Sequence, residues 1–216
     1  MFRQQLLDTS RGRIVSLLRS GPLTADELAS KLKVSASGVR ALITSMGRDG
    51  VVRMVGSRPG TTRPSRLFEL TPDTEQLLSG AYLPLLTQLV DVFARGLPAD
   101  QLDGLLRETG RQLGRQLTPG NRRASLAARV QGASRLLNEK LGAVTRVEEN
   151  GKFLIRGNGC PLSAVTGKHA AVCRAMESLV ETLVGAPVHE CCERTGRPVC
   201  CFEIAKPAVR STPRRG

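Results

Sequence analysis

The sequence predicts a mostly helical α+β protein with an N-terminal winged helix-turn-helix, a helical dimerisation region and a small C-terminal α+β cysteine domain. Three observations lead to this class. Three short amphipathic helices and two strands follow one another in the first 75 residues, long helical patterns fill residues 76–141, and all six cysteines lie near the end of the 216-residue chain. We expect four segments, namely 1–75, 76–141, 142–205 and a disordered basic tail over 206–216.

The overall charge predicts the kind of partner. The chain has 32 Lys and Arg against 19 Asp and Glu, a formal net charge of +13 and a pI near 10.5. Such a balance favours a polyanion, and we expect a double-stranded DNA operator. The most apolar segment, residues 81–94, falls short of the roughly 20 residues that a membrane span needs. We therefore expect a cytoplasmic protein without a membrane partner, in which thiols stay reduced.

The first 50 residues predict three helices. The first is expected over Leu6–Leu18 and is stopped by the Ser-Gly-Pro that follows. Thr24, with Glu27 three residues later, forms a capping box for the second helix. Ser35 or Ser37 opens the third helix, whose core-facing positions are Val39, Ile43 and Met46.

The outer face of the third helix is the predicted DNA-reading surface. It carries small, polar or basic residues, as a helix needs in order to enter the major groove: Ser37, Arg40, Ala41 and Thr44. Two strands, over 51–55 and 66–70, then flank a loop rich in Gly, Pro, Thr and Arg, as in a wing. We expect Arg58, Arg63 and Arg66 to hold phosphates there. The alternative is a packing unit of three helices and a hairpin with no role in DNA binding.

The middle of the chain predicts a buried helix and a dimer. Residues 75–94 are apolar around much of a helix, so we expect this helix to pack against its copy in a homodimer. A two-fold dimer would place two recognition helices about 34 Å apart, one turn of DNA. The spacing of Gly110 and Gly114 indicates close helix packing or chance, and a further amphipathic helix should end at Gly142.

The cysteine region predicts a site built from separate elements. Asn150-Gly151 is typical of a hairpin turn, a helix is expected over His169–Val184, and "PVCCFEI" predicts a strand. Cys160 lies at the hairpin's end, Cys173 on the inward helix face, and Cys200 on the strand face that also carries Phe202 and Ile204. These three cysteines could converge, with Cys191 or Cys192 as a fourth.

Thiolates at this spacing indicate a cofactor. Four of them suit either Zn²⁺ or an iron–sulfur cluster. The chain has no Cys-x₂₋₄-Cys pair of the kind that zinc fingers use, and widely spaced ligands favour a larger centre. The plainer alternative is that the cysteines are free thiols that pack as small hydrophobic side chains.

Four stretches carry a resemblance to a known family: "SASGVRALITSMGRDGVV", "GTTRPSRLFELT", "GCPLSAVTGKHAAVC" and "CERTGRPVCCFEI". Together they resemble the SufR-type regulators, a branch of the ArsR-like winged-helix proteins, over nearly the whole chain except the tail. The helix and wing stretches are shared by many regulators. The Cys-Pro followed by a second cysteine, and the Cys-x-Phe near the end, are more specific.

The resemblance implies a homodimeric repressor that controls iron–sulfur cluster assembly genes through a C-terminal cluster, [4Fe–4S]. Cys160, Cys173 and Cys200 match the family's cysteines. The fourth position departs from the pattern, and Cys192 is preferred there over Cys191 and His189. A zinc-based or thiol-based redox-sensing winged-helix regulator is the alternative.

No enzyme is expected. Cys160 as nucleophile with His169 as base would need a carboxylate to orient the histidine and an oxyanion loop, and the sequence shows neither. We therefore expect no small-molecule substrate.

Overall fold

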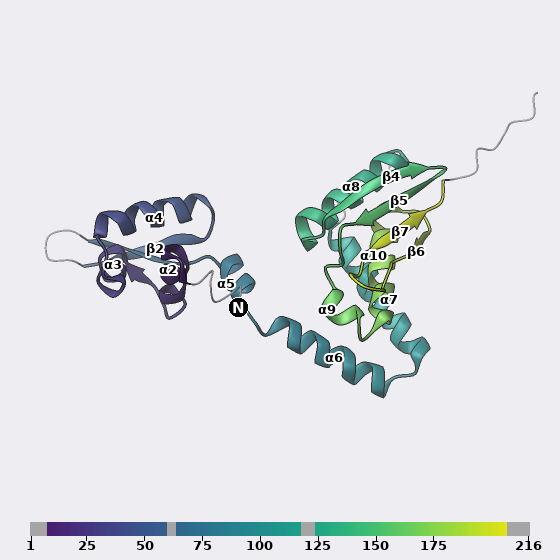
Figure 1. Cartoon of the computed structure of the whole chain (residues 1–216), viewed down its shortest axis with the longest axis horizontal. Helices are drawn as coiled ribbons and strands as arrows, with labels where there is room; N and C mark the ends of the chain where they lie inside the picture. The colour runs from purple at the N-terminus through teal and green to yellow at the C-terminus, as the bar shows by residue number, and fades with distance from the viewer. Residues whose placement is uncertain (1–7, 60–63, 118–123, 207–216) are drawn as a thin grey trace, which may run out of the picture. The chain divides into compact units, whose positions relative to one another are not determined.

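The computed structural model describes residues 8–59, 64–117 and 124–206, which belong to two compact units, Met1–Tyr82 and Leu83–Gly216 (Figure 1). This division differs from the segments expected from sequence, because the helices of 99–141 pack onto the cysteine-bearing part of the chain. The proposed tail falls almost wholly outside the described residues.

The N-terminal unit contains helices and a three-stranded antiparallel sheet. The helices are α2 (Ser10–Leu18), α3 (Ala25–Leu32), α4 (Ala36–Arg48) and α5 (Pro72–Leu78). The sheet has the order β1 (Leu23–Thr24), β3 (Ser65–Leu70) and β2 (Val52–Arg58). Strand β1 was not predicted, because two residues are too few to show an alternating pattern.

The helix starts follow the predicted capping chemistry. Thr24 Oγ1 accepts from the amide of Glu27 at 3.2 Å, and the Glu27 carboxylate accepts from the amide of Thr24 at 2.8 Å. This reciprocal pair confirms the capping box. Ser35 caps α4 through the amide of Gly38, which settles the choice between the two serines.

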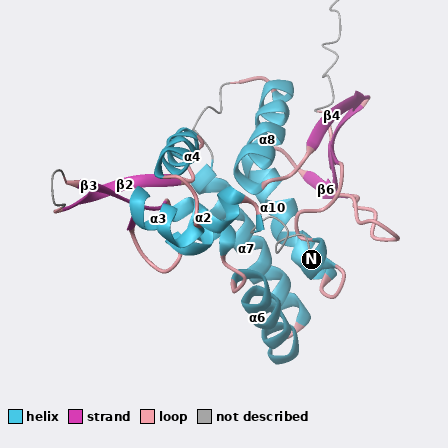
Figure 2. Ribbon diagram, turned by 60° about the vertical axis from the view of Figure 1, so that its left-hand side comes forward, coloured by secondary structure: helices cyan, strands magenta, loops and turns pink. Residues whose placement is uncertain are grey.

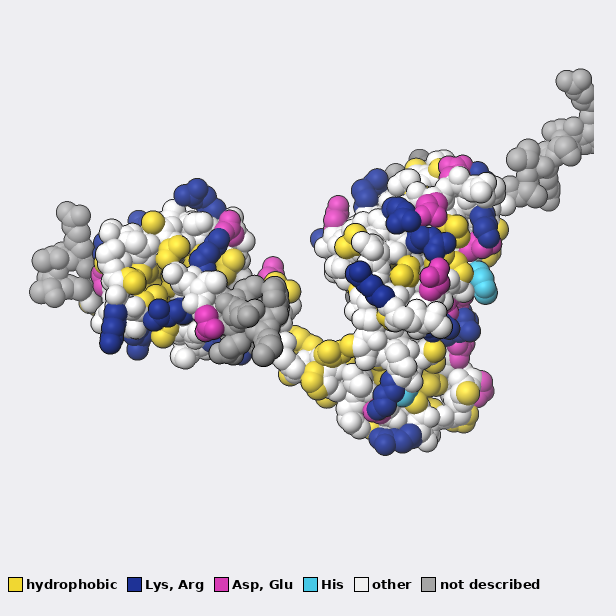
Figure 3. Space-filling model, in the orientation of Figure 1, with side chains coloured by type: hydrophobic (Ala, Val, Ile, Leu, Met, Phe, Trp, Pro, Cys, Tyr) yellow, Lys and Arg dark blue, Asp and Glu magenta, His cyan; other side chains and the backbone are white. Residues whose placement is uncertain are grey.

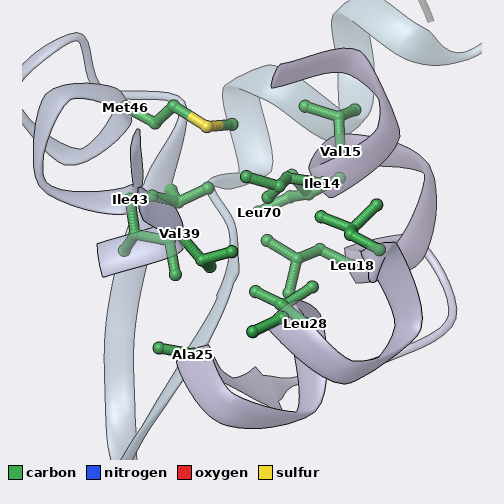
Figure 4. Close-up of a cluster of buried hydrophobic side chains, with 12 residues drawn as sticks. Ile14, Val15, Leu18, Ala25, Leu28, Val39, Ile43, Met46 and Leu70 are labelled. Atoms are coloured by element: carbon green, nitrogen blue, oxygen red, sulfur yellow. The ribbon is translucent and has the colours of Figure 1, made fainter. Parts of the chain in front are cut away.

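The core of the N-terminal unit lies where the three helices meet the sheet (Figure 4). Val39, Ile43 and Met46 of α4 are buried in it, as the sequence predicted. They pack with Ile14 of α2 and Leu28 of α3. This burial fixes the rotation of α4 and leaves its opposite face exposed.

The C-terminal unit combines helices with a four-stranded antiparallel sheet. Its helices are α6 (Tyr82–Gly96, whose first residue ends the N-terminal unit), α7 (Ala99–Leu117), α8 (Leu126–Leu141), α9 (Ser163–Thr166), the 3₁₀ turn η1 (Ala170–Val172) and α10 (Cys173–Val184). The sheet has the order β4 (Thr145–Asn150), β5 (Lys152–Gly157), β7 (Cys201–Ile204) and β6 (Val188–Glu190). The hairpin turns at Gly151, whose φ is +68°, as its sequence predicted.

Helices α8 and α10 cover one face of this sheet (Figure 2). Alternate strand residues point into their shared core, including Phe153 and Ile155 of β5 and Phe202 of β7. The residues between them, such as Lys152 and Arg156, lie on the other face. The expected helix over His169–Val184 is divided, because η1 precedes α10.

Helix α7 packs on α10 with almost no space between the backbones. A Cβ added at Gly110 would lie 2.0 Å from the carbonyl oxygen of Ala175, and one added at Gly114 would lie 2.6 Å from the Cβ of Thr182. The glycine spacing in α7 therefore serves close helix packing, one of the two alternatives that the sequence left open.

Helix α6 keeps most of its apolar side chains exposed in the single chain. Leu85 is 59% exposed and Phe93 46% exposed, whereas Val90 is buried. Among the described residues, no single helix is long and apolar enough to cross a membrane, although α5 and α6 together have the length and apolar composition of a broken span.

Candidate functional site

The first candidate site is the outer face of α4 with the neighbouring strands. The four residues predicted to read DNA all lie exposed on α4: Ser37, Arg40, Ala41 and Thr44. Thr44 Oγ1 donates to the carbonyl of Arg40 at 2.8 Å, which holds this hydroxyl against the helix. The face is therefore low in relief, with Arg40 as its longest side chain.

A cleft of about 590 Å³ runs between α4 and strands β2 and β3. Arg40 and Thr44 line its helix side, and Arg53, Met54 and Arg66 line its strand side. Arg53 was missed by the sequence analysis, because the alternation of β2 alone does not show that its side chain reaches this cleft. Three arginines and Asp26 thus share this concave surface.

Carboxylates of the same unit hold several of these arginines. Arg40 pairs with Asp26 at 2.6 Å, and Arg53 pairs with Glu69 at 2.7 Å. Arg58 pairs with Glu27, whose pKa is lowered first by the backbone hydrogen bond from Thr24 and further by Arg58. These pairs are exposed and cheap to break. Of the other predicted phosphate contacts, Arg66 is exposed and Arg63 lies outside the described residues.

The second candidate site is the cysteine region, and strand β6 determines its geometry. In the β6–β7 pair Glu190 lies opposite Phe202, and the same register continues to a bridge between Glu193 and Val199. Cys191 therefore lies opposite Cys201 and Cys192 opposite Cys200. Neighbouring residues of a strand point to opposite faces, so the two cysteine pairs are on different faces of the sheet.

Three of the predicted ligands come together on the helix-covered side. An interaction with the side chain of Cys192, followed by burial, raises the pKa of the Cys173 thiol. The pKa of Cys192 is raised as well: its contact with Cys173 lowers it, but a contact with Cys200 and burial outweigh that effect. Cys173, Cys192 and Cys200 thus lie close enough together to influence one another's ionisation.

Cys160 lies at the edge of the same core. Like Cys192, Cys160 packs against the buried cluster that contains Cys200. The amide of Cys200 donates to the carbonyl of Gly159 at 3.3 Å, which joins the backbone beside Cys160 to the residue that precedes β7. The Cys160 sulfur itself lies 3.8 Å from Thr166 Oγ1 and lines a surface cavity of about 260 Å³.

Arg194 is a charged residue of this site that sequence reasoning missed. Its pKa is raised chiefly by a hydrogen bond with Cys173, and its guanidinium also pairs with Glu190 at 2.6 Å. The Glu190 carboxylate in turn accepts from the amide of Cys192 at 2.9 Å. Only the fold brings Arg194 beside Cys173, so no spacing in the sequence could have shown it.

The two histidines lie apart from the group formed by Cys173, Cys192 and Cys200. His189 is exposed on β6 opposite Glu203. His169 is mostly buried and pairs with Asp91 of α6, which also accepts from Lys168 at 2.8 Å. Asp91 supplies the carboxylate partner that the sequence did not reveal, but the Cys160 sulfur contacts the hydroxyl of Thr166.

The remaining two cysteines occupy the other face of the sheet. The sulfurs of Cys191 and Cys201 lie 2.7 Å apart. Burial, followed by the contact with Cys201, raises the pKa of Cys191 to about 12. All six cysteines are free thiols in this structure. Within the described ranges, no three His, Cys, Asp or Glu side chains are grouped so that they could hold one metal ion.

Comparison with known proteins finds distant structural likeness. The chain is similar to PadR of Bacillus subtilis, solved in complex with operator DNA, with 15% sequence identity and a TM-score of 0.27. The alignment covers 80% of this chain and 94% of that chain. No family model and no curated protein matches the sequence. Because a TM-score this low does not establish a shared fold, the function has to be inferred from the residues of the two sites.

Proposed function

We propose that the chain is a homodimeric DNA-binding transcriptional regulator that senses iron and redox status through an iron–sulfur cluster in its C-terminal unit. The cluster, [4Fe–4S], would be held by Cys160, Cys173, Cys192 and Cys200. The observation that carries this proposal is the register that places Cys192 opposite Cys200 on the helix-covered face, together with the interaction of Cys192 with Cys173 of α10 that shifts the pKa of both thiols.

The register of β6 and β7 supports Cys192 as the fourth ligand. Cys192 is directly across from Cys200 and on the same face, whereas Cys191 points to the other face and His189 is exposed. For Cys191 or His189 to bind the same centre, the β6 segment would have to rotate so that its outer face pointed toward the helices.

The donor set fits a cluster better than a single zinc ion. Zinc would need four sulfurs at about 2.3 Å from one point. A [4Fe–4S] cluster binds each thiolate at a different iron, so its ligands stand further apart and come from separate elements. Cys160 supports ligands that stand further apart, because its neighbour Gly159 is hydrogen-bonded to Cys200 while its own sulfur contacts Thr166.

The protein's own groups would hold and neutralise such a centre. A bound iron–sulfur cluster supplies one-electron chemistry and lability toward oxidants. Cys173 and Cys192, whose pKa values are raised, must lose their protons on binding, so loading should become more favourable as pH rises. Arg194 beside Cys173 places a positive charge next to the thiolates.

Helix α6 offers a route from this site toward the rest of the chain. The segment between Cys160 and Cys173 packs on α6 through Val165 and Val172, which contact Val90. Asp91 of α6 pairs with Lys168 and His169 of the same segment. A change in the ligand-bearing segment would therefore be felt by α6, the helix on which the dimer is proposed to form.

The proposed dimer would use the exposed stripe of α6. Its apolar residues recur at three- and four-residue intervals: Tyr82, Leu85, Leu86, Leu89 and Phe93. Figure 3 shows hydrophobic side chains gathered along this helix. The stripe contains no charged residue, so its best complement is an equally apolar stripe, which a second copy provides.

The sensor half is tested by anaerobic purification with iron and sulfide analysis. We expect about four irons and four sulfides per chain, and the Cys192→Ser protein should lose most of them. Cys191→Ser is the matched control and should keep its cluster. A colourless wild-type protein with one zinc per chain would instead support the alternative regulator.

The DNA half is tested with an operator selected from random duplexes. Arg40→Ala should weaken binding by about 1–3 kcal/mol, the value of a good base contact. Arg19→Ala, which removes an exposed arginine at the end of α2, is the control. Equal losses in both variants would show that α4 does not read the duplex. If the cluster-bound form is the repressor, removal of the cluster should weaken operator binding, and the bound genomic sites should lie beside cluster assembly genes.

A further inference from the structure

Cys191 and Cys201 form a second cysteine site that the proposed cluster does not use. They face each other across the β6–β7 register, one position before the Cys192–Cys200 pair. The amide of Cys191 donates to the carbonyl of Cys201 at 2.8 Å, and their sulfurs lie 2.7 Å apart. Both side chains point away from the core beneath α8 and α10, which contains Cys200 but not Cys201.

The geometry permits a disulfide without movement of the backbone. Residues directly opposite in an antiparallel pair have Cα atoms about 4.5–5.5 Å apart. A disulfide needs Cα atoms about 4.4–6.8 Å apart. The sulfurs are already in contact, so bond formation needs only a small rotation of the side chains.

The surroundings give oxidants access from one side. Cys191 is half-buried, whereas Cys201 is only 2% exposed. The same outer face carries charged residues, with Arg156 opposite Cys201 and Lys152 paired with Glu203. A small polar oxidant therefore reaches the Cys191 sulfur first, and the Cys201 thiol lies next to it and can react in the second step.

We infer that Cys191 and Cys201 form a reversible dithiol–disulfide site that responds to peroxide independently of the four cluster ligands. In the first step the Cys191 sulfur loses its proton and attacks hydrogen peroxide as the thiolate; the O–O bond breaks, the sulfur becomes a sulfenic acid, and the departing hydroxide takes up the proton as one water. In the second step the Cys201 thiol attacks that sulfur, the S–S bond forms, and the hydroxyl leaves with the thiol proton as a second water. The two thiols are oxidised by two electrons and the peroxide is reduced by two. A dithiol reductant reverses the change by exchange and leaves as its own disulfide.

The disulfide would close the loop over residues 191–201 at its base. This loop carries Cys192 and Cys200 just inside the new bond, so the bond would fix the spacing of these two residues without using either. Oxidation of the outer pair would thus leave a cluster-free protein with its inner pair still reduced and still opposed. The inference rests on the register and the sulfur contact alone and does not need the proposed cluster.

The test uses the full-length, cluster-free protein, fully reduced and then treated with one equivalent of hydrogen peroxide. After the remaining thiols are blocked, the free-thiol count should fall from six to four, and a dithiol reductant should restore it. The double variant Cys192→Ser/Cys200→Ser should still form the cross-link between the two tryptic peptides that carry residues 191 and 201. The matched double variant Cys191→Ser/Cys201→Ser should not form it.

Two outcomes would overturn the inference. One is a thiol count that stays at six in the wild-type protein. The other is a cross-link that survives Cys191→Ser/Cys201→Ser and disappears in Cys192→Ser/Cys200→Ser, because the inner pair would then be the oxidised one. If a double variant does not fold, the single variants Cys191→Ser and Cys201→Ser decide, since each should abolish the two-thiol loss. None of these measurements depends on iron, so the result stands apart from the proposed cluster.

Discussion

Single carboxylates control the arginines of the N-terminal unit. Asp26 holds Arg40, the longest side chain on the outer face of α4, and Glu27 holds Arg58 of β2. A phosphate or a guanine edge would have to compete with these carboxylates for the same guanidinium groups. In the free protein these two arginines are therefore partly neutralised.

We predict that Asp26→Asn strengthens DNA binding by up to about fivefold, because an exposed pair is worth at most about 1 kcal/mol. The measurement is fluorescence anisotropy with the selected operator at fixed salt. Asp49→Asn is the control: it removes the same charge from the same unit but frees Arg11 of α2 instead. If both variants gain equally, the effect is one of net charge and not of Arg40.

At the scale of elements, the packing of α7 on α10 makes the sharpest stability prediction. Gly110→Ala would bring a methyl group to 2.0 Å from the Ala175 carbonyl oxygen, so the two helices must separate. We expect a loss of about 1–3 kcal/mol in unfolding free energy, typical of overpacking. Thermal denaturation of the C-terminal unit measures it.

Gly104→Ala on the same helix is its control. A methyl group there meets nothing within 4 Å, so the change should be neutral or stabilising by up to about 1 kcal/mol through helix propensity. Equal losses in the two variants would contradict the close-packing explanation.

The link between α6 and the ligand-bearing segment makes a pH prediction. The pKa of Asp91 is lowered by its hydrogen bonds with Lys168 and then His169. A lowered folded-state pKa means that the ionised carboxylate stabilises the link above its usual pKa of 3.8, and that this contribution is lost as pH falls through the lower value. Protection factors for amide exchange over residues 163–172 should therefore fall in acid.

Asp91→Asn should lower those protection factors already at neutral pH and flatten their dependence on pH. Asp100→Asn, an exposed position at the start of α7, should leave both unchanged. A wild-type response that persists in Asp91→Asn would assign the acid effect to another group.

The sequence predicted those elements whose signals are local. The capping box at Thr24, the core face of α4 and the Asn150-Gly151 turn are confirmed, because each depends on residues within a few positions of one another. Strands β1 and β6 were missed, since two or three residues show no alternation. The pairing of Cys192 with Cys200 depends on β6, so only the fold could supply it. The ligand set itself stays a prediction.

At the scale of the whole molecule, the exposed stripe of α6 decides the oligomeric state. Leu86→Glu would place a charge in the middle of the proposed dimer contact, and we expect a monomer by analytical ultracentrifugation at concentrations where the wild-type protein is a dimer. Operator binding should weaken in parallel, because two linked half-site contacts become one.

Leu105→Glu gives the comparison, because this leucine is also exposed, 53% against 44% for Leu86, but lies on α7. It should remain a dimer. A wild-type protein that is monomeric across the same concentrations would remove the basis for a two-fold arrangement on DNA.

The glycine contact between α7 and α10 also determines which part of the proposed sensor can move. Cys173 begins α10, and α10 cannot roll or slide against α7 while Ala175 and Thr182 rest on Gly110 and Gly114. The two helices should therefore move as one rigid body, with the Cys173 thiol at the start of α10. If a proposed bound centre were lost, Cys173 would stay in place, and the change in backbone conformation would occur in the short segment between Cys160 and Val172.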